Sequence, residues 1–598
     1  MRQDLPDPEK QTAPCLPHPS RRHTNKTRLP RIPRQIKSFI KKARAGSAIR
    51  RSLKREAGGL LRVKTALATL GLWFFLPGIS FANAEIEAHS KTLIASIAQE
   101  PRTLNTLTAE SVSYTAQVLA HTNEGLLRYD GKRRLTGGVA QRWEVAADRL
   151  TFWLREDAAW EDGTPVTAQD FVFAWQKLVD PNTAAPSANL AAPIKHASAI
   201  LAGNADPKAL GVSALSAAIL RVDLAHPCAW CLKLMTNPIF YPINQAFYEA
   251  AGDQFGTRPK THLANGAFKI KDWQRGKRLE LTQNSHYWRH DAVALTAITF
   301  DHISADPRTQ LNLFRAGELA IARLDRDTLK AAMNEGLRVK TFPTGHLFHI
   351  QFSHVNDMLS ANQSLRSAIS LVIDKDELVN KVVASPGTRV ADSMFHDWLT
   401  IGDTPYLTAR PPNRHRPDVK AAKEHLARAR AEMNLPDRPR LTLTINDSTL
   451  YRRVAEYLQA RLDTHLNIEL LIDPQTTQRM VEKWRAGTSD MTLITWPVDV
   501  DDPMDQISFM GDPNFRRVFK GLYAGDDMAA LYYQARAAIH QADRVEQVHK
   551  VHQFFTERVT VLPLFEPYGA AVIKPNLKGF IWQPVRGYAD FRAIRTSP

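Results

Sequence analysis

The sequence predicts a mixed α/β protein. Short segments with alternating apolar residues recur along the chain, and segments with helical periodicity lie between them. The order strand, helix, strand, helix is clearest in the C-terminal half, where it predicts a mostly parallel sheet flanked by helices. A chain of 598 residues has room for several domains of ordinary size.

Two strands and one helix are well marked in the N-terminal half. Lys91–Ala98 and Arg149–Arg155 alternate apolar residues and are rich in β-branched or aromatic side chains, which is typical of strands. Thr167–Asp180 predicts a helix with Thr167 as its N-cap. Its large apolar residues are spaced to share one face. They are Phe171, Trp175 and Leu178.

The C-terminal half alternates between the two kinds of element. Val419–Met433 and Tyr451–Leu466 have the periodicity of amphipathic helices. Leu441–Asp447, Asn467–Asp473 and Met491–Trp496 have the composition of strands. No internal repeat and no low-complexity tract occurs after Ala84.

The basic character of the chain is concentrated at its N-terminus. The formal net charge is +17, and Met1–Lys64 contributes +14 of it through 18 Lys and Arg against 4 Asp and Glu. The remainder from Glu85 has a net charge of only +3. The leader does not indicate nucleic-acid binding, because its basic residues lack interleaved aromatic residues.

An uncharged segment follows the basic leader and predicts an export signal. Thr65–Ser80 is apolar, basic residues precede it, and Ala82 and Ala84 occupy the two small-residue positions of a cleavage site. Segment 65–84 thus has the h- and c-regions of a signal peptide. We expect cleavage between Ala84 and Glu85 and a mature protein in the periplasm.

Two points about this N-terminal region stay open. A transmembrane anchor is the alternative, but the segment barely reaches the ~20 residues that span a bilayer, and Pro77 and Gly78 interrupt it. Residues 1–64 are rich in Pro and Arg without apolar periodicity, so we expect no fold there. Either translation starts further along, near Val63, or the n-region is unusually long.

The mature chain contains two cysteines, Cys228 and Cys231, because Cys15 lies in the leader. In an oxidising compartment a local disulfide is the simplest interpretation of this C-x-x-C pair. A metal site is the alternative, but no second pair and no nearby histidine cluster completes four ligands. A thioredoxin-like redox role requires the motif at the start of a helix that follows a strand.

The sequence contains no motif that indicates catalysis. The mature chain has no G-x-S-x-G, H-E-x-x-H, Walker or G-x-G-x-x-G motif. The acidic segment Asp499–Asp505 lacks the glycine and the closing glutamate of an EF-hand. It is either a solvated acidic loop or a ligand contact. We expect no enzymatic activity and no cofactor.

One long motif carries a resemblance to a known family. Gly138–Pro186 reads GVAQRWEVAADRLTFWLREDAAWEDGTPVTAQDFVFAWQKLVDPNTAAP. This segment resembles the signature of the family-5 extracellular solute-binding proteins, close to those that bind oligopeptides and murein peptides. Further segments that resemble the family occur in the family's order, one before this motif and the others after it, so that the resemblance covers nearly the whole chain from Lys91. These segments are Glu124–Asp130, Asn265–Trp273, Asn284–Trp288, Phe314–Ile321, Leu365–Val379 and Leu562–Gly579.

The resemblance implies an α/β, three-lobed periplasmic binding protein with mixed sheets and a hinged ligand cleft. It implies that lobe I is assembled from three separated segments, with lobe II and lobe III inserted between them. The implied segments are 85–123, 245–345 and 569–598 for lobe I, 124–244 for lobe II and 346–568 for lobe III. It further implies a monomer that delivers peptides to an inner-membrane ABC permease and ATPase.

The resemblance also implies ligand-binding residues. In the family, an aspartate that follows a Trp-containing strand end meets the α-ammonium group of the peptide, and Asp499 and Trp496 occupy these positions. Glu110, Ser111 and Val112 match a segment of lobe I that pairs with the peptide backbone. Such backbone pairing suits a binder that accepts many sequences. The alternative is that Asp499 is simply one surface acid among several and does not contact the ligand.

The chain departs from the family at the positions that bind the peptide carboxylate. Relatives that take free C-termini carry arginines where this chain has Trp484 and Leu493. Loss of these arginines removes charge-assisted contacts. Arg485 and Arg323 are the candidates to replace them. The departure puts the preferred peptide length in doubt and favours a modified or murein-derived peptide.

Two alternative functions follow from the same residues. Within the same fold, the alternative is a non-peptide ligand such as haem, a nickel complex or an opine. From a different class, a periplasmic hydrolase would use the acids of Asp499–Asp505, and no motif supports it.

Overall fold

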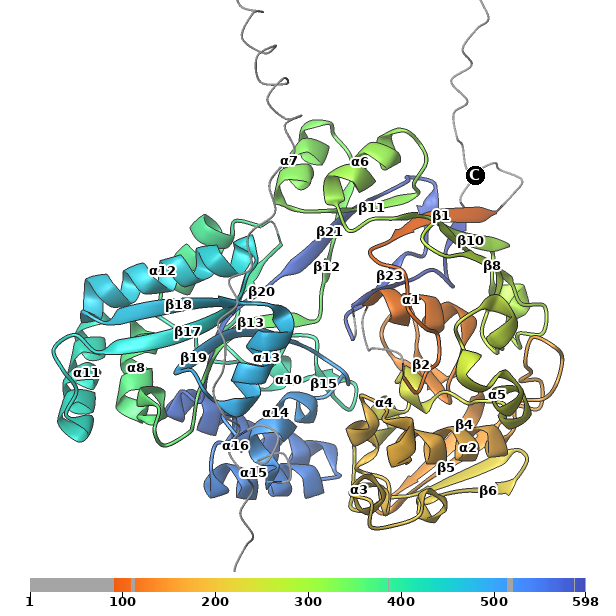
Figure 1. The fold of residues 1–598 in the computed structure, drawn as a ribbon, viewed down its shortest axis with the longest axis horizontal. Coiled ribbons are helices and arrows are strands. Elements are labelled where there is room, and N and C mark those ends of the chain that lie inside the picture. The colour runs from red at the N-terminus through yellow and green to blue at the C-terminus, as the bar shows by residue number, and fades with distance from the viewer. Residues whose placement is uncertain (1–90, 109–112, 386, 514–519, 586, 597–598) are drawn as a thin grey trace, which may run out of the picture. The chain divides into compact units, whose positions relative to one another are not determined.

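The computed structural model of the protein describes residues 91–108, 113–385, 387–513, 520–585 and 587–596. The leader and the expected cleavage site lie outside these residues. The described chain is a mixed α/β structure with four sheets of three or more strands (Figure 1).

One four-stranded sheet combines the start of the described chain with a later segment. β1 pairs in parallel with β10, while β9 pairs antiparallel with both β10 and β8. Leu93, Phe268 and Phe300 belong to its buried core. The strands are β1 (Thr92–Ile97), β8 (Phe268–Gln274), β9 (Arg278–Gln283) and β10 (Ala297–Ile303).

A three-stranded antiparallel sheet contains a strand from near the C-terminus. β21 lies between β11 and β12, so that Ala571 is opposite both Arg323 and Lys340. The strands are β11 (Ile321–Leu324), β12 (Val339–Pro343) and β21 (Tyr568–Ile573). The helices α6 (Pro307–Arg315) and α7 (Arg326–Asn334) contact this sheet, whereas α1 (Ser113–Thr122) contacts β8 of the four-stranded sheet and α5 (Gln245–Ala251) packs against the helix at 168–179.

A second four-stranded sheet is antiparallel throughout and packs on the predicted helix. Phe171, Trp175 and Leu178 on α2 are fully buried in its core, as their spacing predicted. Asp170 accepts hydrogen bonds from the backbone N–H and the hydroxyl of Thr167 at the start of the helix. The elements are β4 (Ala140–Ala146), β5 (Arg149–Leu154), β6 (Val212–Ser216), β7 (Ile219–Asp223), α2 (Ala168–Val179), α3 (Ala197–Leu201) and α4 (Cys231–Leu234).

The six-stranded sheet is mixed, which corrects the prediction of a mostly parallel sheet. β18, β17 and β19 are parallel, as the strand–helix alternation predicted, but β13, β20 and β14 continue the sheet in antiparallel pairings. β13 precedes the segment in which strands and helices alternate, and β20 follows it. The periodicity of that segment therefore could not predict these two strands. The strands are β13 (His346–Phe352), β14 (Arg389–Val390), β17 (Arg440–Asn446), β18 (Glu469–Gln475), β19 (Met491–Pro497) and β20 (Val561–Glu566).

Two groups of helices accompany this sheet. α8, α11 and α12 share its first hydrophobic core, and Figure 1 shows α12 lying along β17 and β18. α14, α15 and α16 contribute to a second core with Ile494 of β19. The helices are α8 (Gln363–Leu371), α9 (Lys375–Glu377), α10 (Tyr406–Ala409), α11 (Val419–Met433), α12 (Thr449–Leu466), α13 (Thr477–Ala486), α14 (Met504–Gly511), α15 (Asp526–Ala537) and α16 (Gln541–Arg558).

Two connections join the three-stranded sheet to the six-stranded sheet. β12 continues into β13, and β20 continues into β21. The hydroxyl of Thr344 in the first connection donates a hydrogen bond of 2.7 Å to the carbonyl of Pro567 in the second. Gly345 has φ +79°, and a Cβ there would lie 1.9 Å from the carbonyl oxygen of Pro584. The bond between Thr344 and Pro567 makes the two connections one paired crossing. Position 345 requires glycine because of its positive φ and its close approach to Pro584.

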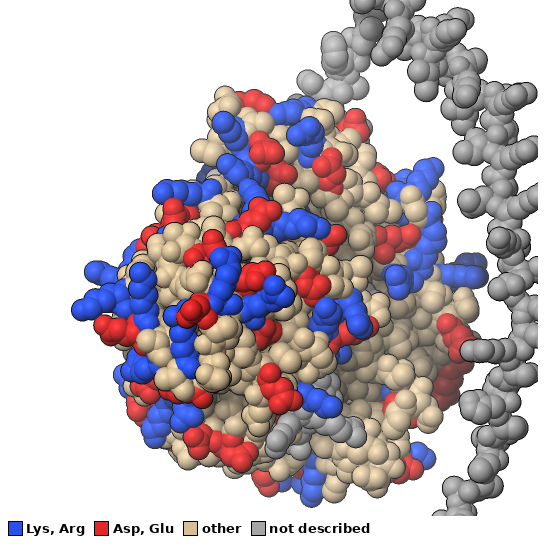
Figure 2. Space-filling model, turned by 60° about the vertical axis from the view of Figure 1, so that its left-hand side comes forward, with Lys and Arg blue, Asp and Glu red and all other residues tan. Residues whose placement is uncertain are grey.

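Short strand pairs complete the structure, and the surface carries charges of both signs. Figure 2 shows acidic and basic side chains intermingled over the visible face. No helix of the described residues is long and apolar enough to cross a bilayer. The short strands are β2 (Leu127–Tyr129), β3 (Leu135–Gly137), β15 (Thr400–Ile401), β16 (Thr404–Pro405), β22 (Leu577–Lys578), β23 (Ile581–Gln583), β24 (Tyr588–Asp590) and β25 (Arg595–Thr596).

Candidate ligand-binding site

The C-terminal end of β19 has an edge that suits an extended ligand. β13 pairs with β19 along its whole length, from His346 opposite Pro497 to Phe352 opposite Met491. On its other side, β19 pairs with β17 only at Met491 and Thr492. No described strand pairs with the rest of this edge. An extended chain added at this edge would continue the ladder of the sheet.

The two residues that the family resemblance singled out lie at this end of β19. Trp496 is in the strand, opposite Leu347 of β13. Asp499 is half-buried in the loop that follows, and its backbone N–H donates a hydrogen bond of 2.9 Å to Oδ2 of Asp505. Asp505 lies in the first turn of α14 (Met504–Gly511), so the start of this helix fixes the backbone of Asp499.

Three of the four acids in the segment after β19 are buried. Asp501, Asp502 and Asp505 are all buried. Asp502 forms a buried ion pair with Arg544 of α16, with 2.6 Å between Nη2 and Oδ1. Asp501 accepts hydrogen bonds of 2.9 and 3.1 Å from the backbone N–H and the hydroxyl of Thr400. The solvated-loop alternative is therefore wrong for these three acids, which hold the loop in place.

The same loop contacts the antiparallel four-stranded region. Nζ of Lys233, on α4, donates hydrogen bonds of 2.8 Å to the carbonyl of Thr400 and 2.7 Å to the carbonyl of Asp501. Val500 is buried in the hydrophobic core that includes α2, and Trp230 packs against that core and against the core of α14–α16. Burial raises the pKa of Asp501 to about 6, although Lys233 and Thr400 act to lower it.

Arg323 lines a large cavity beside the three-stranded sheet. The cavity has a volume of about 420 Å³, within the range of small-molecule sites. The guanidinium carbon of Arg323 lies 5.4 Å from the ring centroid of Trp582, and the Trp582 ring is stacked on Phe342. Arg323 is an exposed residue at the wall of this cavity, and partial desolvation by the surrounding protein lowers the pKa of Arg323. Polar side chains also line the cavity, namely Ser96, Tyr114, Gln117, Gln310 and Asp325.

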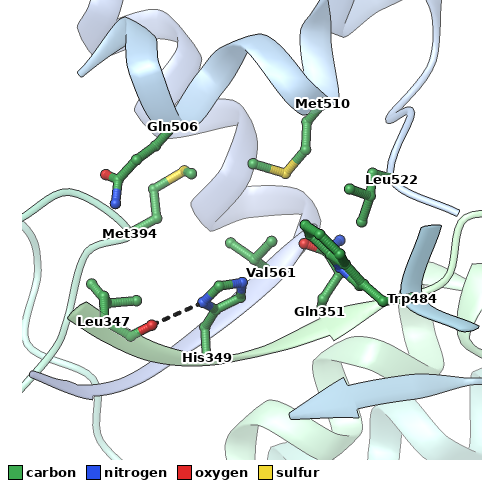
Figure 3. A pocket seen from close by; sticks show the side chains of 9 residues that line it. All are labelled: Leu347, His349, Gln351, Met394, Trp484, Gln506, Met510, Leu522 and Val561. Atoms are coloured by element: carbon green, nitrogen blue, oxygen red, sulfur yellow. Dashed lines mark hydrogen bonds between the residues drawn. The ribbon is translucent and has the colours of Figure 1, made fainter. Parts of the chain in front are cut away.

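A smaller cavity lies between β13 and α14. Figure 3 shows His349 rising from β13 toward Gln506 and Met510 of α14, with Met394 and Trp484 at the sides. Its volume of about 40 Å³ holds one or two water molecules. Burial lowers the pKa of His349 to about 4, so its imidazole is neutral at pH 7. We assign this space to packing rather than to ligand binding.

The remaining predicted residues lie apart from the end of β19. Arg485 is exposed on the last turn of α13, the helix that leads into the start of β19. It does not line either cavity described above. Glu110, Ser111 and Val112 lie outside the described residues. The structure therefore brings Trp496 and Asp499 together but places Arg485 toward the opposite end of the strand.

Cys228 and Cys231 are joined in a disulfide in the structure. Both side chains are buried, and Cys231 is the first residue of α4, the helix that carries Lys233. The preceding strand β7 ends at Asp223, so the motif does not directly follow a strand. Among the residues that the structure covers, no group of three or more His, Cys, Asp or Glu is arranged to hold a metal ion.

Sequence reasoning did not single out Lys233 or Arg544. Lys233 and Asp501 are 268 positions apart, and Arg544 and Asp502 are 42 apart. Neither basic residue lies in a motif. The cluster of acids after β19 indicates that basic residues compensate their charge, because acids are rarely buried without a partner. It does not identify those basic residues.

The mixed sheets and the paired crossing between them define the class of the protein as a solute-binding protein. The chain belongs to the family of bacterial extracellular solute-binding proteins, family 5, whose model matches residues 134–515. This confirms the resemblance drawn from Gly138–Pro186. Members of this family are transport components and not enzymes.

Three curated relatives are similar over most of their length. The chain is 27% identical over 525 residues to the periplasmic murein peptide-binding protein MppA of Escherichia coli (strain K12), covering 86% of this chain and 94% of the relative. It is 28% identical over 508 residues to the periplasmic oligopeptide-binding protein OppA of Salmonella typhimurium, covering 82% and 90%. A probable deoxycholate-binding periplasmic protein, YgiS of Escherichia coli, is 25% identical over 493 residues, covering 80% and 89%.

Solved structures confirm the fold class. The structure of the Escherichia coli murein tripeptide binding protein MppA matches with a TM-score of 0.71 at 26% identity, covering 85% of this chain and 99% of the other. The substrate-binding domain of an oligopeptide ABC transporter from Bacillus anthracis matches with a TM-score of 0.70 at 26% identity, covering 86% and 99%. The fold is that of a periplasmic binding protein with mixed sheets.

Proposed function

We propose that this solute-binding protein captures short peptides in the periplasm and delivers them to an ABC importer. The open edge of β19 carries the proposal, because no described strand pairs with this edge beyond Thr492 and an extended peptide can add there as a strand. The peptide N-terminus lies at Asp499, whose carboxylate forms a charge-assisted hydrogen bond with the α-ammonium group. The names of MppA and OppA support a peptide ligand.

We further propose that the chain acts as three lobes that close on the peptide. Lobe I comprises 85–123, 245–345 and 569–598, lobe II comprises 124–244, and lobe III comprises 346–568. The paired crossing at Thr344 and Pro567 supports a hinge between lobes I and III. Lys233 of lobe II contacts the loop beside Asp499, which supports closure around the ligand.

The protein reaches the periplasm through the signal segment 65–84, and its mature chain begins at Glu85. N-terminal sequencing of protein from a periplasmic extract tests this part of the proposal. Recovery of the intact leader in a membrane fraction would show that the segment is an anchor.

Native mass spectrometry of the protein purified without refolding tests the ligand class. We expect a bound species with the mass of a short peptide, identified by fragmentation after release. Calorimetry with tetra-alanine should then show binding to the ligand-stripped protein. Binding of deoxycholate in place of every peptide tested would overturn the peptide proposal and favour a non-peptide ligand, as the name of YgiS suggests for that relative.

A further inference from the structure

We propose that a further cavity, lined by residues between 370 and 563, binds a free α-amino acid with an apolar side chain. The cavity has a volume of about 190 Å³. This is below the ~300 Å³ at which sites for larger organic ligands begin, so the cavity suits a single amino acid better than a peptide. Two of its lining residues, Asn413 and Arg414, are exposed and place its mouth at the surface. The proposal goes beyond the peptide function and does not depend on it.

The cavity is separate from the open edge of β19. It lies against β20, which contributes Val561, Leu562 and Pro563 to its lining. In the six-stranded sheet β13 lies between β20 and β19, and the open edge of β19 is on the side away from β13. A solute in this cavity therefore does not occupy the place proposed for the peptide.

The first observation is a buried ammonium group with few partners. Lys375, the first residue of α9, is 4% exposed, and its Nζ donates a hydrogen bond of 2.8 Å to the carbonyl of Ala391. Oδ1 of Asp392 lies 3.8 Å from Nζ, which exceeds the length of a hydrogen bond. In the part of the chain that the structure describes, Nζ makes no other hydrogen bond, although an ammonium group has three donors. Lysine is rarely buried without a close partner, so this position suits the carboxylate of a solute.

Lys375 keeps its charge at neutral pH. Burial lowers the pKa of Lys375 to about 8, while the opposite charge of Asp392 acts to raise it, so the group is mostly protonated at pH 7. His415 and His552 also line the cavity. Burial lowers the pKa of both histidines, that of His552 to about 4, so both rings are neutral at pH 7.

The second observation is the carboxylate beside this ammonium group. Oδ1 of Asp392 accepts a hydrogen bond of 3.1 Å from the backbone N–H of His415, and Oδ2 accepts none from the described residues. The exposed Arg414 of the lining already donates hydrogen bonds of 2.8 and 2.7 Å to the carboxylate of Asp376. An amino acid can place its carboxylate at Lys375 and its ammonium group at Asp392, which matches both charges of the zwitterion. A simple anion would be repelled by Asp392, and a simple cation would be repelled by Lys375.

The third observation is the apolar part of the wall. Phe555 and Val559 come from the end of α16, Leu562 comes from β20, and Met394 comes from the segment after β14. An aliphatic side chain would bury its surface against these residues. A charged side chain would lose its hydration there without gaining a partner. The cavity therefore favours an apolar amino acid such as leucine.

Calorimetry with three related compounds tests which groups of the solute are recognised. The compounds are L-leucine, L-leucinamide, which lacks the carboxylate, and 4-methylpentanoate, which lacks the ammonium group. We expect L-leucine to bind about tenfold or more tightly than either analogue, because each analogue leaves one charge of the protein unmatched. Absence of L-leucine binding, or binding of either analogue as tight as that of L-leucine, would overturn the proposal.

Asn413→Trp blocks the mouth of the cavity without changing the charged pair. Asn413 is exposed, and its side chain makes no hydrogen bond with the described residues, so the variant should keep the Tm of the wild type and lose L-leucine binding. Arg416→Trp is the matched control, because Arg416 is exposed and does not line the cavity. L-leucine bound by Asn413→Trp as tightly as by the wild type would place the amino acid elsewhere, and the proposal would be wrong.

Lys375→Met tests the proposed partner of the carboxylate. The variant should bind L-leucine about tenfold or more weakly than the wild type, with little change for L-leucinamide. Lys381→Met, at an exposed lysine a few residues further on, should bind like the wild type. Circular dichroism checks that both variants are folded. An unchanged affinity of folded Lys375→Met for L-leucine would contradict the assignment.

Titration of L-leucine into protein saturated with tetra-alanine separates this cavity from the proposed peptide site. We expect the same affinity for L-leucine with and without the peptide. Competition between the two would place L-leucine at the peptide site, and this proposal would fail while the peptide function stands. If tetra-alanine does not bind, but L-leucine binds and Asn413→Trp abolishes that binding, the peptide function fails and the amino-acid site stands.

Discussion

Nζ of Lys233 lies 2.7 Å from the carbonyl oxygen of Asp501 and 3.9 Å from its Oδ2. The two residues come from distant parts of the chain, since Lys233 follows the disulfide on α4 and Asp501 lies in the loop after β19. The contact is two residues from Asp499. A lysine of proposed lobe II therefore holds the loop that carries the proposed amine-binding carboxylate.

Replacing Lys233 by methionine should weaken ligand binding by about tenfold, or about 1.4 kcal/mol. Methionine keeps much of the apolar stem but removes the hydrogen bonds to Thr400 and Asp501, and it leaves the buried Asp501 without a nearby cation. Calorimetry measures the affinity. Lys208→Met, at an exposed lysine of the same region, should bind like the wild type. An unchanged affinity in Lys233→Met would show that the contact does not contribute to the ligand-bound state.

Removing the disulfide should lower stability modestly and barely affect binding. The bond joins residues three positions apart, and closing so short a loop stabilises the chain by roughly 2 kcal/mol in the loop-entropy model. We expect Cys228→Ser/Cys231→Ser to lose about that much unfolding free energy in urea and to keep its ligand affinity within about threefold. Two reactive thiols in the unfolded, unreduced wild type would contradict an oxidised pair.

Buried histidines should make the protein less stable at pH 5 than at pH 7.5. Burial lowers the pKa of His121 to about 4, against the raising effect of Asp590. Its Nε2 accepts a hydrogen bond of 2.9 Å from the backbone N–H of Phe591, while Nδ1 is bonded to the carbonyl of Gln117. The neutral ring thus joins α1 to the C-terminal segment. Between pH 6.5 and pH 4 the unfolded chain binds the proton more readily, so acidification favours unfolding.

Urea unfolding of His121→Gln checks this pH dependence. Glutamine is uncharged at both pH values and has a donor and an acceptor for the same two partners. The variant should therefore lose less stability on acidification than the wild type, by on the order of 2 kcal/mol at pH 5. The same substitution at exposed His290 should leave the pH dependence of the wild type. Equal pH dependence in His121→Gln and the wild type would rule out His121 as a contributor.

Local structure followed from the sequence where periodicity was strong. Val419–Met433 was predicted with the bounds of α11, and the predicted helix at Thr167–Asp180 corresponds to α2. The antiparallel part of the six-stranded sheet could not be predicted from periodicity, because β13 and β20 enter this sheet through the paired crossing from another sheet. The sequence also did not predict that the acids after β19 are buried. Composition cannot show that Lys233 and Arg544, distant in sequence, compensate their charge.

The proposed amine clamp predicts a large effect of Asp499→Asn. Truncating one partner of a buried charged pair typically costs ~2–5 kcal/mol, which corresponds to roughly 30-fold or more in affinity. Free peptides should therefore bind much more weakly to the variant. N-acetylated peptides lack the α-ammonium group and should bind the wild type weakly and lose little further in the variant. Calorimetry with both peptide forms and both proteins separates these effects.

The control for this prediction has to lie outside the network that holds the loop. Asp505 is unsuitable, because its buried carboxylate accepts the hydrogen bond from the backbone N–H of Asp499, and we expect Asp505→Asn to weaken binding as well. Asp403 is an exposed acid in the turn that follows β15, and Asp403→Asn should change the affinity little if the effect at Asp499 is a direct contact. Free-peptide binding by Asp499→Asn as tight as that of the wild type would show that Asp499 does not hold the peptide N-terminus.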